Sequence, residues 1–124
     1  MFASLVLNQL IALSLTILIE TPVMFCGFFK ERKAIGTGYL LLYCVLINSI
    51  TNISINTIIN IFRWLLHPSV VIYWVVVAVL EILVAVSEIC LFKMAVSKYV
   101  GMLKISVTVI VANIVSFGMG LLIF

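Results

Sequence analysis

Residues 69–92 read SVVIYWVVVAVLEILVAVSEICLF, an apolar stretch whose only charged residues are Glu81 and Glu88. A helix needs about 20 predominantly apolar residues to cross the hydrocarbon core of a bilayer. The run is continuous and does not alternate, which argues against the short strands of a membrane barrel. The stretch therefore predicts a transmembrane helix with two carboxyl groups inside it.

The whole chain has the same character as this stretch. Of its 124 residues, 66% are hydrophobic and 9% are charged, and its mean hydropathy is +1.44. Soluble domains are nearer half apolar and a quarter charged. We expect an all-α integral membrane protein that forms a single domain over residues 1–124. Its four transmembrane helices, in two hairpins, are predicted at about 3–28, 37–62, 69–92 and 104–124.

The loops between these spans predict the orientation. Cytoplasmic loops of membrane proteins carry an excess of Lys and Arg. Two loops on the same side of the membrane together carry six basic residues, whereas the opposite side has only Arg63. The six are Lys30, Arg32, Lys33, Lys93, Lys98 and Lys104. We therefore expect a multi-pass protein of the cell membrane with both termini on the non-cytoplasmic side.

Three carboxyl groups fall inside the predicted spans. Glu20 belongs to the first span, and Glu81 and Glu88 belong to the third. A charged side chain in a bilayer is costly, so it usually faces the protein interior and has a partner or a function. Glu81 and Glu88 are seven residues apart, which places them within about 20° of each other on one helical face.

The second span carries a row of amides in the stretch LINSITNISINTIIN, residues 46–60. Asn48, Asn52, Asn56 and Asn60 recur every four residues, and each step turns the row by about 40°. The four side chains therefore cannot all face one partner. Depths counted from the span ends place Asn48, Glu81 and Asn113 at the midplane, with Glu20 and Glu88 nearer the cytoplasm.

The two hairpins share an order of features. Glu20 is followed by a basic loop and then by NSIT at 48–51, and Glu88 is followed by a basic loop and then by NIVS at 113–116. The spacing from acid to Asn is 28 residues in one hairpin and 25 in the other. Parallel repeats of this kind occur in some transporters, with the site at the repeat interface. An internal repeat and chance similarity in an apolar chain both remain open.

These residues predict an oxygen-rich site rather than a catalytic one. Hard cations take oxygen ligands, whereas protons need only the carboxylates. The candidate ion- or substrate-binding residues are Glu20, Glu81, Glu88, Asn48, Asn52, Asn113 and Ser116. No catalytic residue, cofactor or nucleic-acid partner is expected, and whether a metal binds is left open.

In size and number of helices the chain resembles the small multidrug transporters, which carry a membrane-embedded glutamate in their first helix. Glu20 lies near the end of the first span here, and Glu81 and Glu88 have no counterpart in that pattern. The stretch NIVSFGMG, residues 113–120, resembles the Asn and Ser-Phe-x-x-Gly run of small fluoride channels with one residue missing. No site residue is carried over from either family.

Three functions fit the sequence. The first is a transporter- or channel-like protein, with a homodimer forming the pathway, that binds a proton or cation through its glutamates and asparagines. The second is a non-catalytic structural or regulatory subunit that pairs with another membrane protein. The third is an intramembrane enzyme acting on a lipid-linked substrate, which is disfavoured because no nucleophile arrangement is present.

Overall fold

The computed structural model describes residues 2–123, and these residues form helices and no strands. Four helices are long and apolar enough to cross a membrane. The helices are α1 (Phe2–Gly27), α2 (Arg32–Ile35), α3 (Thr37–Leu66), α4 (Val70–Val96) and α5 (Met102–Ile123). The expected all-helical architecture with four apolar helices is confirmed.

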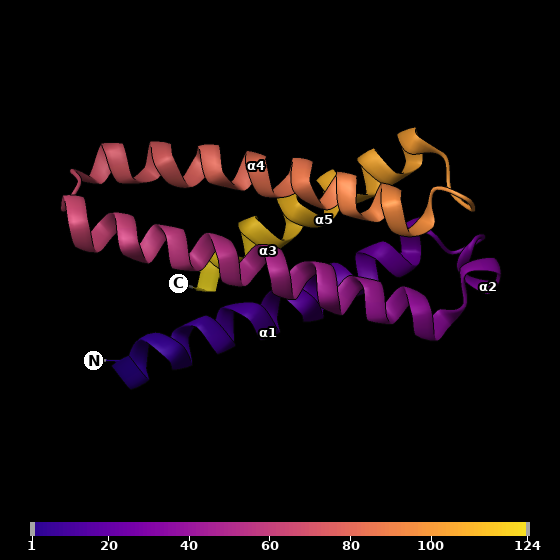
Figure 1. The fold of residues 1–124 in the computed structure, drawn as a ribbon, viewed down its shortest axis with the longest axis horizontal. Helices are drawn as coiled ribbons and strands as arrows, with labels where there is room; N and C mark the ends of the chain where they lie inside the picture. The colour runs from indigo at the N-terminus through magenta and orange to yellow at the C-terminus, as the bar shows by residue number, and fades with distance from the viewer. Residues whose placement is uncertain (1, 124) are drawn as a thin grey trace.

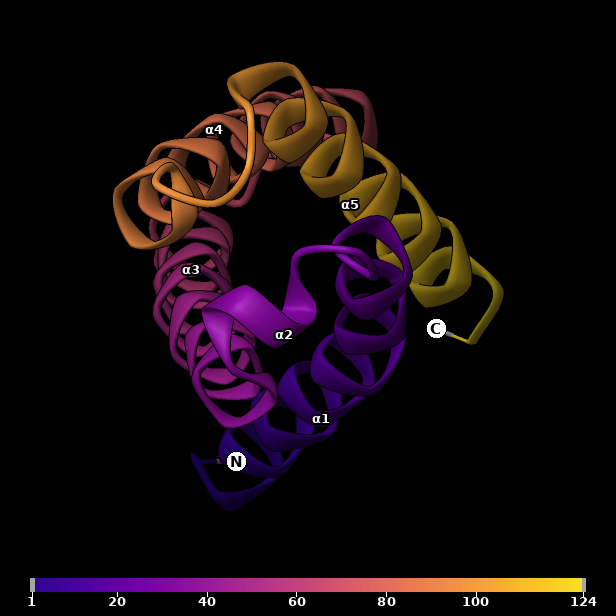
Figure 2. The same ribbon diagram turned by 90° about the vertical axis from the view of Figure 1, so that its right-hand side faces the viewer.

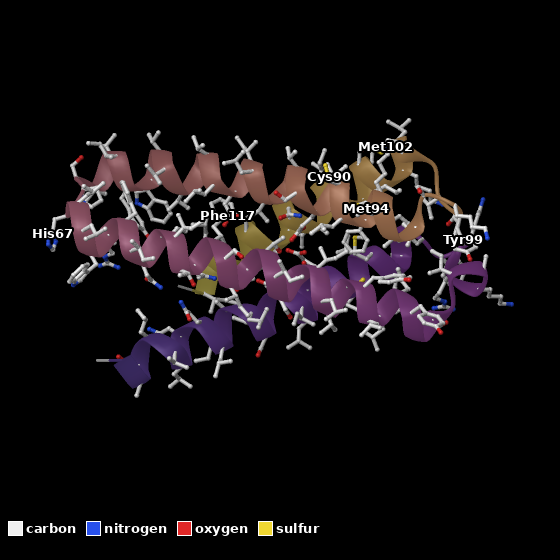
Figure 3. The ribbon with its side chains drawn as sticks, in the orientation of Figure 1. His67, Cys90, Met94, Tyr99, Met102 and Phe117 are labelled. Atoms are coloured by element: carbon white, nitrogen blue, oxygen red, sulfur yellow. The ribbon has the colours of Figure 1, made fainter. Side chains whose placement is uncertain are left out.

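The four long helices form a ring in the order α1, α3, α4, α5, with α1 also packed against α5 (Figure 2). Neighbouring helices run in opposite directions (Figure 1). One end of the bundle carries both termini and the turn at His67, and the other carries α2 and the loop with Tyr99 (Figure 3). We call these the terminal end and the basic end.

Backbone constraints explain where the helices stop. His67 takes the left-handed conformation (φ 41°) that caps α3, and Pro68 follows it. Proline disfavours helical geometry in the residue before it, so α3 cannot continue into α4. Helix α3 continues beyond residue 62 to Leu66, and α4 continues beyond residue 92 to Val96. Arg63 and Lys93, which mark the predicted span ends, are good helix formers and do not terminate a helix.

The basic half of the bundle contains a closely packed apolar core, which we call the plug. Its side chains come from all four long helices and both basic-end loops, and most are almost fully buried. The plug consists of Met24, Phe28, Ile35, Leu40, Cys44, Ile47, Phe92, Val96, Val100, Ile105, Val109 and Ala112. Phe28 and Phe92 meet across the bundle with ring centroids 6.4 Å apart. Such packing leaves little room for water on this side.

An ion pair joins the loop before α2 to the first turn of α5. Lys104 Nζ lies 2.6 Å from Glu31 Oε1 and 2.8 Å from Glu31 Oε2. The hydrogen bond from Lys104 holds the pKa of Glu31 below its usual value. Since both side chains are partly exposed, the pair orients the loop more than it stabilises the fold.

Helices α1 and α5 are in close contact at Gly27. A Cβ added at this glycine would lie 2.6 Å from Thr108 Oγ1, and closer still to the methyl group of the same residue. Small residues allow this kind of backbone approach between membrane helices.

We expect Gly27→Ala to lower the free energy of unfolding by about 1–3 kcal/mol, because overpacking forces α1 and α5 apart. Thermal unfolding in detergent would measure the change. Gly118→Ala is the matched control, since an added Cβ there meets nothing within 4 Å. Adding Thr108→Ala to Gly27→Ala should restore part of the loss. Equal effects of the two glycine substitutions would contradict the proposed close contact.

Candidate functional site

Glu88 on α4 is a buried acid whose two carboxylate oxygens both accept hydrogen bonds inside the bundle. The Thr51 hydroxyl on α3 donates to Oε1 over 2.7 Å, and the Asn113 amide on α5 donates to Oε2. The residue is only 2% exposed. Because each oxygen accepts one hydrogen bond from a neighbouring helix, this carboxylate joins three of the four long helices.

Glu20 on α1 brings the fourth helix to the same place. It is 3% exposed and lies near the Ser116 hydroxyl, and ionised forms of Glu20 and Glu88 would repel each other more strongly than those of Glu20 and Glu81. Two carboxylates therefore lie near each other in a layer that supplies only neutral hydrogen-bond donors.

Asn48 on α3 belongs to this layer by helical register. Asn52 Nδ2 donates to Thr16 Oγ1 over 3.0 Å, which fixes how α1 and α3 lie against each other. Glu20 is four residues further along α1 and Asn48 four residues back along antiparallel α3, so the two are level. Asn48 is 1% exposed, and neither its Oδ1 nor its Nδ2 has a hydrogen-bond partner.

The predicted depths of two of these residues were wrong. Asn48 and Asn113 were expected at the level of Glu81, but Asn48 is level with Glu20 and the Asn113 amide binds Glu88. Glu20, Asn48, Glu88 and Asn113 therefore form one layer, which we call the carboxylate layer, and Glu81 lies about two turns nearer the terminal end. The error arose because the helices differ in length, from 22 residues in α5 to 30 in α3, so the middle of each helix does not lie at the same depth.

A cavity of about 320 Å³ leads from the carboxylate layer toward the terminal end. Its wall begins at Glu20, Thr51, Glu88 and Asn113 and extends along the four helices to Ala12, Asn60, Tyr73 and Ile123. The α1 and α3 ribbons diverge toward the N-terminus (Figure 1), and Phe117, which lines the cavity, lies within the bundle (Figure 3). The plug closes the opposite side of the layer.

The remaining amides and Glu81 line this cavity. Asn52 accepts a hydrogen bond from Asn56 Nδ2 and donates to Thr16, and Asn60 lies near the terminal end. Glu81 and Ser116 are also part of the wall. The seven sequence-predicted site residues thus form two groups. Four belong to the carboxylate layer: Glu20, Asn48, Glu88 and Asn113. Three line the cavity next to the layer or nearer the terminal end: Glu81, Asn52 and Ser116.

Sequence reasoning missed Thr16 and Thr51, which bind Asn52 and Glu88. Threonine is common in membrane helices, where its hydroxyl often donates to the backbone carbonyl four residues earlier. Residue type alone therefore did not indicate a contact with another helix. Thr51 lies one turn from Asn48 on α3, and that shared face was the available indication. Among residues 2–123, no group of three or more His, Cys, Asp or Glu has the geometry to hold a metal ion.

No protein-family model matches the chain, and no curated protein or solved structure is detectably similar to it. The functional argument therefore depends on the geometry of the carboxylate layer and its cavity.

We expect Thr51→Val to destabilise the protein by about 1–2 kcal/mol, because it removes a donor to a buried carboxylate while keeping the side-chain shape. Thr57→Val is the matched control on the same helix, since its exposed hydroxyl bonds only to the Ile53 carbonyl. Thermal unfolding of both variants in the same detergent would measure the difference. A Thr51→Val midpoint no lower than that of Thr57→Val would contradict a structural role for this hydrogen bond.

Proposed function

We propose that the protein is a transporter- or channel-like protein of the cell membrane that binds a proton or a cation at Glu20 and Glu88. The observation that carries the proposal is the position of these two buried carboxylates at the floor of a cavity that leads to one end of the bundle. Intramembrane acids in such positions mark ion pathways and proton relays in many membrane proteins. Asn113 and Ser116 would support the carboxylates, and Glu81 would attract cations into the cavity.

The distribution of basic residues supports the orientation that we propose for this site. Both loops at the basic end would be cytoplasmic, and both termini would lie on the opposite side, with the chain forming two hairpins across the bilayer. The cavity would then open away from the cytoplasm. Because one chain encloses little volume, we propose that a homodimer or a complex with another membrane protein completes the pathway.

A structural or regulatory subunit is the competing proposal, and one observation favours it. Thr51 and Asn113 already donate hydrogen bonds to Glu88, and Asn52 donates to Thr16 within the bundle. Polar contacts of this kind can specify a unique helix packing without any transport. An intramembrane enzyme has less support, because the layer holds no nucleophile beside a base.

We expect Glu88→Gln to reduce ion flux at least about tenfold. Loss of this carboxylate should weaken ion binding by more than about 1.4 kcal/mol, which corresponds to a factor of about ten. Purified protein in lipid vesicles would be tested with an entrapped pH-sensitive dye and with a tracer cation, under an imposed membrane potential. Glu20→Gln and Glu81→Gln would be measured in the same way.

Glu31→Gln is the control for this experiment, since it makes the same chemical change outside the spans. It should leave flux unchanged. Flux at the wild-type level in both Glu88→Gln and Glu81→Gln would refute the transport proposal. Absence of flux together with a stoichiometric protein partner in mild detergent would favour the regulatory subunit.

The proposed orientation predicts which side of the membrane reaches the cavity. In a background of Cys26→Ala, Cys44→Ala and Cys90→Ala, Asn56→Cys should react with a membrane-impermeant thiol reagent added to whole cells. Ile58→Cys is the control, because Ile58 lies on the same helix but is 50% exposed on the outer surface of the bundle, where it would face lipid. Reaction of Asn56→Cys only in inverted vesicles would reverse the orientation.

A further inference from the structure

We propose that the carboxylate layer binds one dehydrated monovalent cation of Na⁺ size, held by Glu88, Glu20 and the side-chain carbonyl of Asn48. This inference rests on the proposed function, because it uses the same carboxylates, and it names the class of ion that they bind. It assigns Asn48 the role of an ion ligand and gives Glu81 no direct contact with the ion.

The first step is the unsatisfied amide of Asn48. A buried side-chain amide without a hydrogen-bond partner destabilises the fold, and native interiors rarely leave one. Asn48 has both polar atoms in this state at 1% exposure. Asn113, in the corresponding place of the other hairpin, instead donates to Glu88. The first hairpin therefore presents a free carbonyl and a free amide where the second has a completed bond.

The second step is the direction of the Asn48 side chain. On α3 it lies about 60° from Thr51, which binds α4, and about 40° from Asn52, which binds α1. It therefore points between α4 and α1, toward the bundle axis and the space between Glu88 and Glu20. Cys44, one turn closer to the basic end on nearly the same face, lies within electrostatic range of both carboxylates.

The third step is the charge of the layer. The ion pair between Lys104 and Glu31 lies at the basic end, and neither Glu20 nor Glu88 takes part in it. A carboxylate has about four lone-pair positions, and Glu88 uses one on each oxygen, so both oxygens can still contact a cation. Two adjacent buried carboxylates need a counter-charge, and a proton on one with a monovalent cation at the other leaves the layer neutral.

The fourth step is the choice of ion. Calcium takes six to eight oxygen ligands, and magnesium keeps several of its waters. The three proposed ligands offer at most five oxygens, two each from Glu20 and Glu88 and one from Asn48, and the plug leaves little room for a hydration shell on its inner side. A small ion that sheds its water readily and accepts mixed carboxylate and amide oxygens fits this set. Na⁺ has these properties.

Thermal unfolding of the purified protein would test the inference without any transport measurement. Replacing choline chloride with NaCl at constant ionic strength should raise the unfolding midpoint in a saturable way, because the ion binds only the folded state. KCl should have a smaller effect. Asn48→Ala should abolish the Na⁺-dependent shift, whereas Asn56→Ala, the same change near the cavity mouth, should retain it.

Carbodiimide labelling of wild-type protein provides a second test that does not depend on a variant folding. Dicyclohexylcarbodiimide modifies protonated carboxyl groups in apolar surroundings, and peptide mass spectrometry locates the product. At a Na⁺ concentration about ten times the dissociation constant, only about a tenth of the sites are free. Modification should then slow about tenfold at whichever of Glu20 and Glu88 exchanges its proton for the ion, while modification of Glu81 is unchanged.

Equal unfolding midpoints in NaCl and choline chloride, together with carbodiimide modification of Glu20 and Glu88 that Na⁺ does not slow, would overturn the inference. A buried water would then be the partner of the Asn48 amide. A full Na⁺-dependent shift in Asn48→Ala would also overturn the inference. If Na⁺ has no effect but Glu88→Gln still abolishes proton flux, the proposed function stands with the proton as its ion. If Na⁺ binds but no flux occurs, the site stands and the transport proposal fails.

Discussion

The carboxylate of Glu88 is the constraint on which the arrangement of the bundle depends. An acid buried in a low-dielectric interior must have donors aimed at it, and the donors that reach Glu88 are neutral side chains of neighbouring helices. Thr51 and Asn113 supply one hydrogen bond each, so the positions of α3 and α5 relative to α4 are tied to a single group. Apolar packing between membrane helices is weakly directional, and these polar contacts select one rotation of each helix among many.

The bundle is divided along its length into two parts with different chemistry. Toward the basic end, bulky apolar residues such as Phe28 and Phe92 pack across the axis. Toward the terminal end, amides and acids line an open cavity. The boundary is the layer of Glu20, Asn48, Glu88 and Asn113. A uniformly packed four-helix bundle would need neither the acids nor the cavity, so this asymmetry is the main structural argument for a function beyond packing.

The sequence was sufficient for the number and type of the helices, because hydrophobic length is a strong one-dimensional signal. It also identified the buried acids, since a charge within an apolar run is conspicuous. It failed for the depths of Asn48 and Asn113, because the helices differ in length and their midpoints therefore lie at different levels. It could not find the Thr51 and Thr16 contacts, because a hydrogen bond between helices depends on rotation and tilt that a single span does not encode.

The plug has an electrical consequence. A cavity that admits water and is lined by amides carries the potential of the solution at its mouth down to the carboxylate layer, whereas a dry apolar region does not conduct. In a bilayer, the transmembrane voltage would therefore fall mainly across the short distance from Glu88 to the basic-end loops. One elementary charge crossing that distance would experience most of the roughly 2.3 kcal/mol that each 100 mV supplies. The plug would then concentrate the field at the one barrier that an ion leaving the layer for the basic end has to cross.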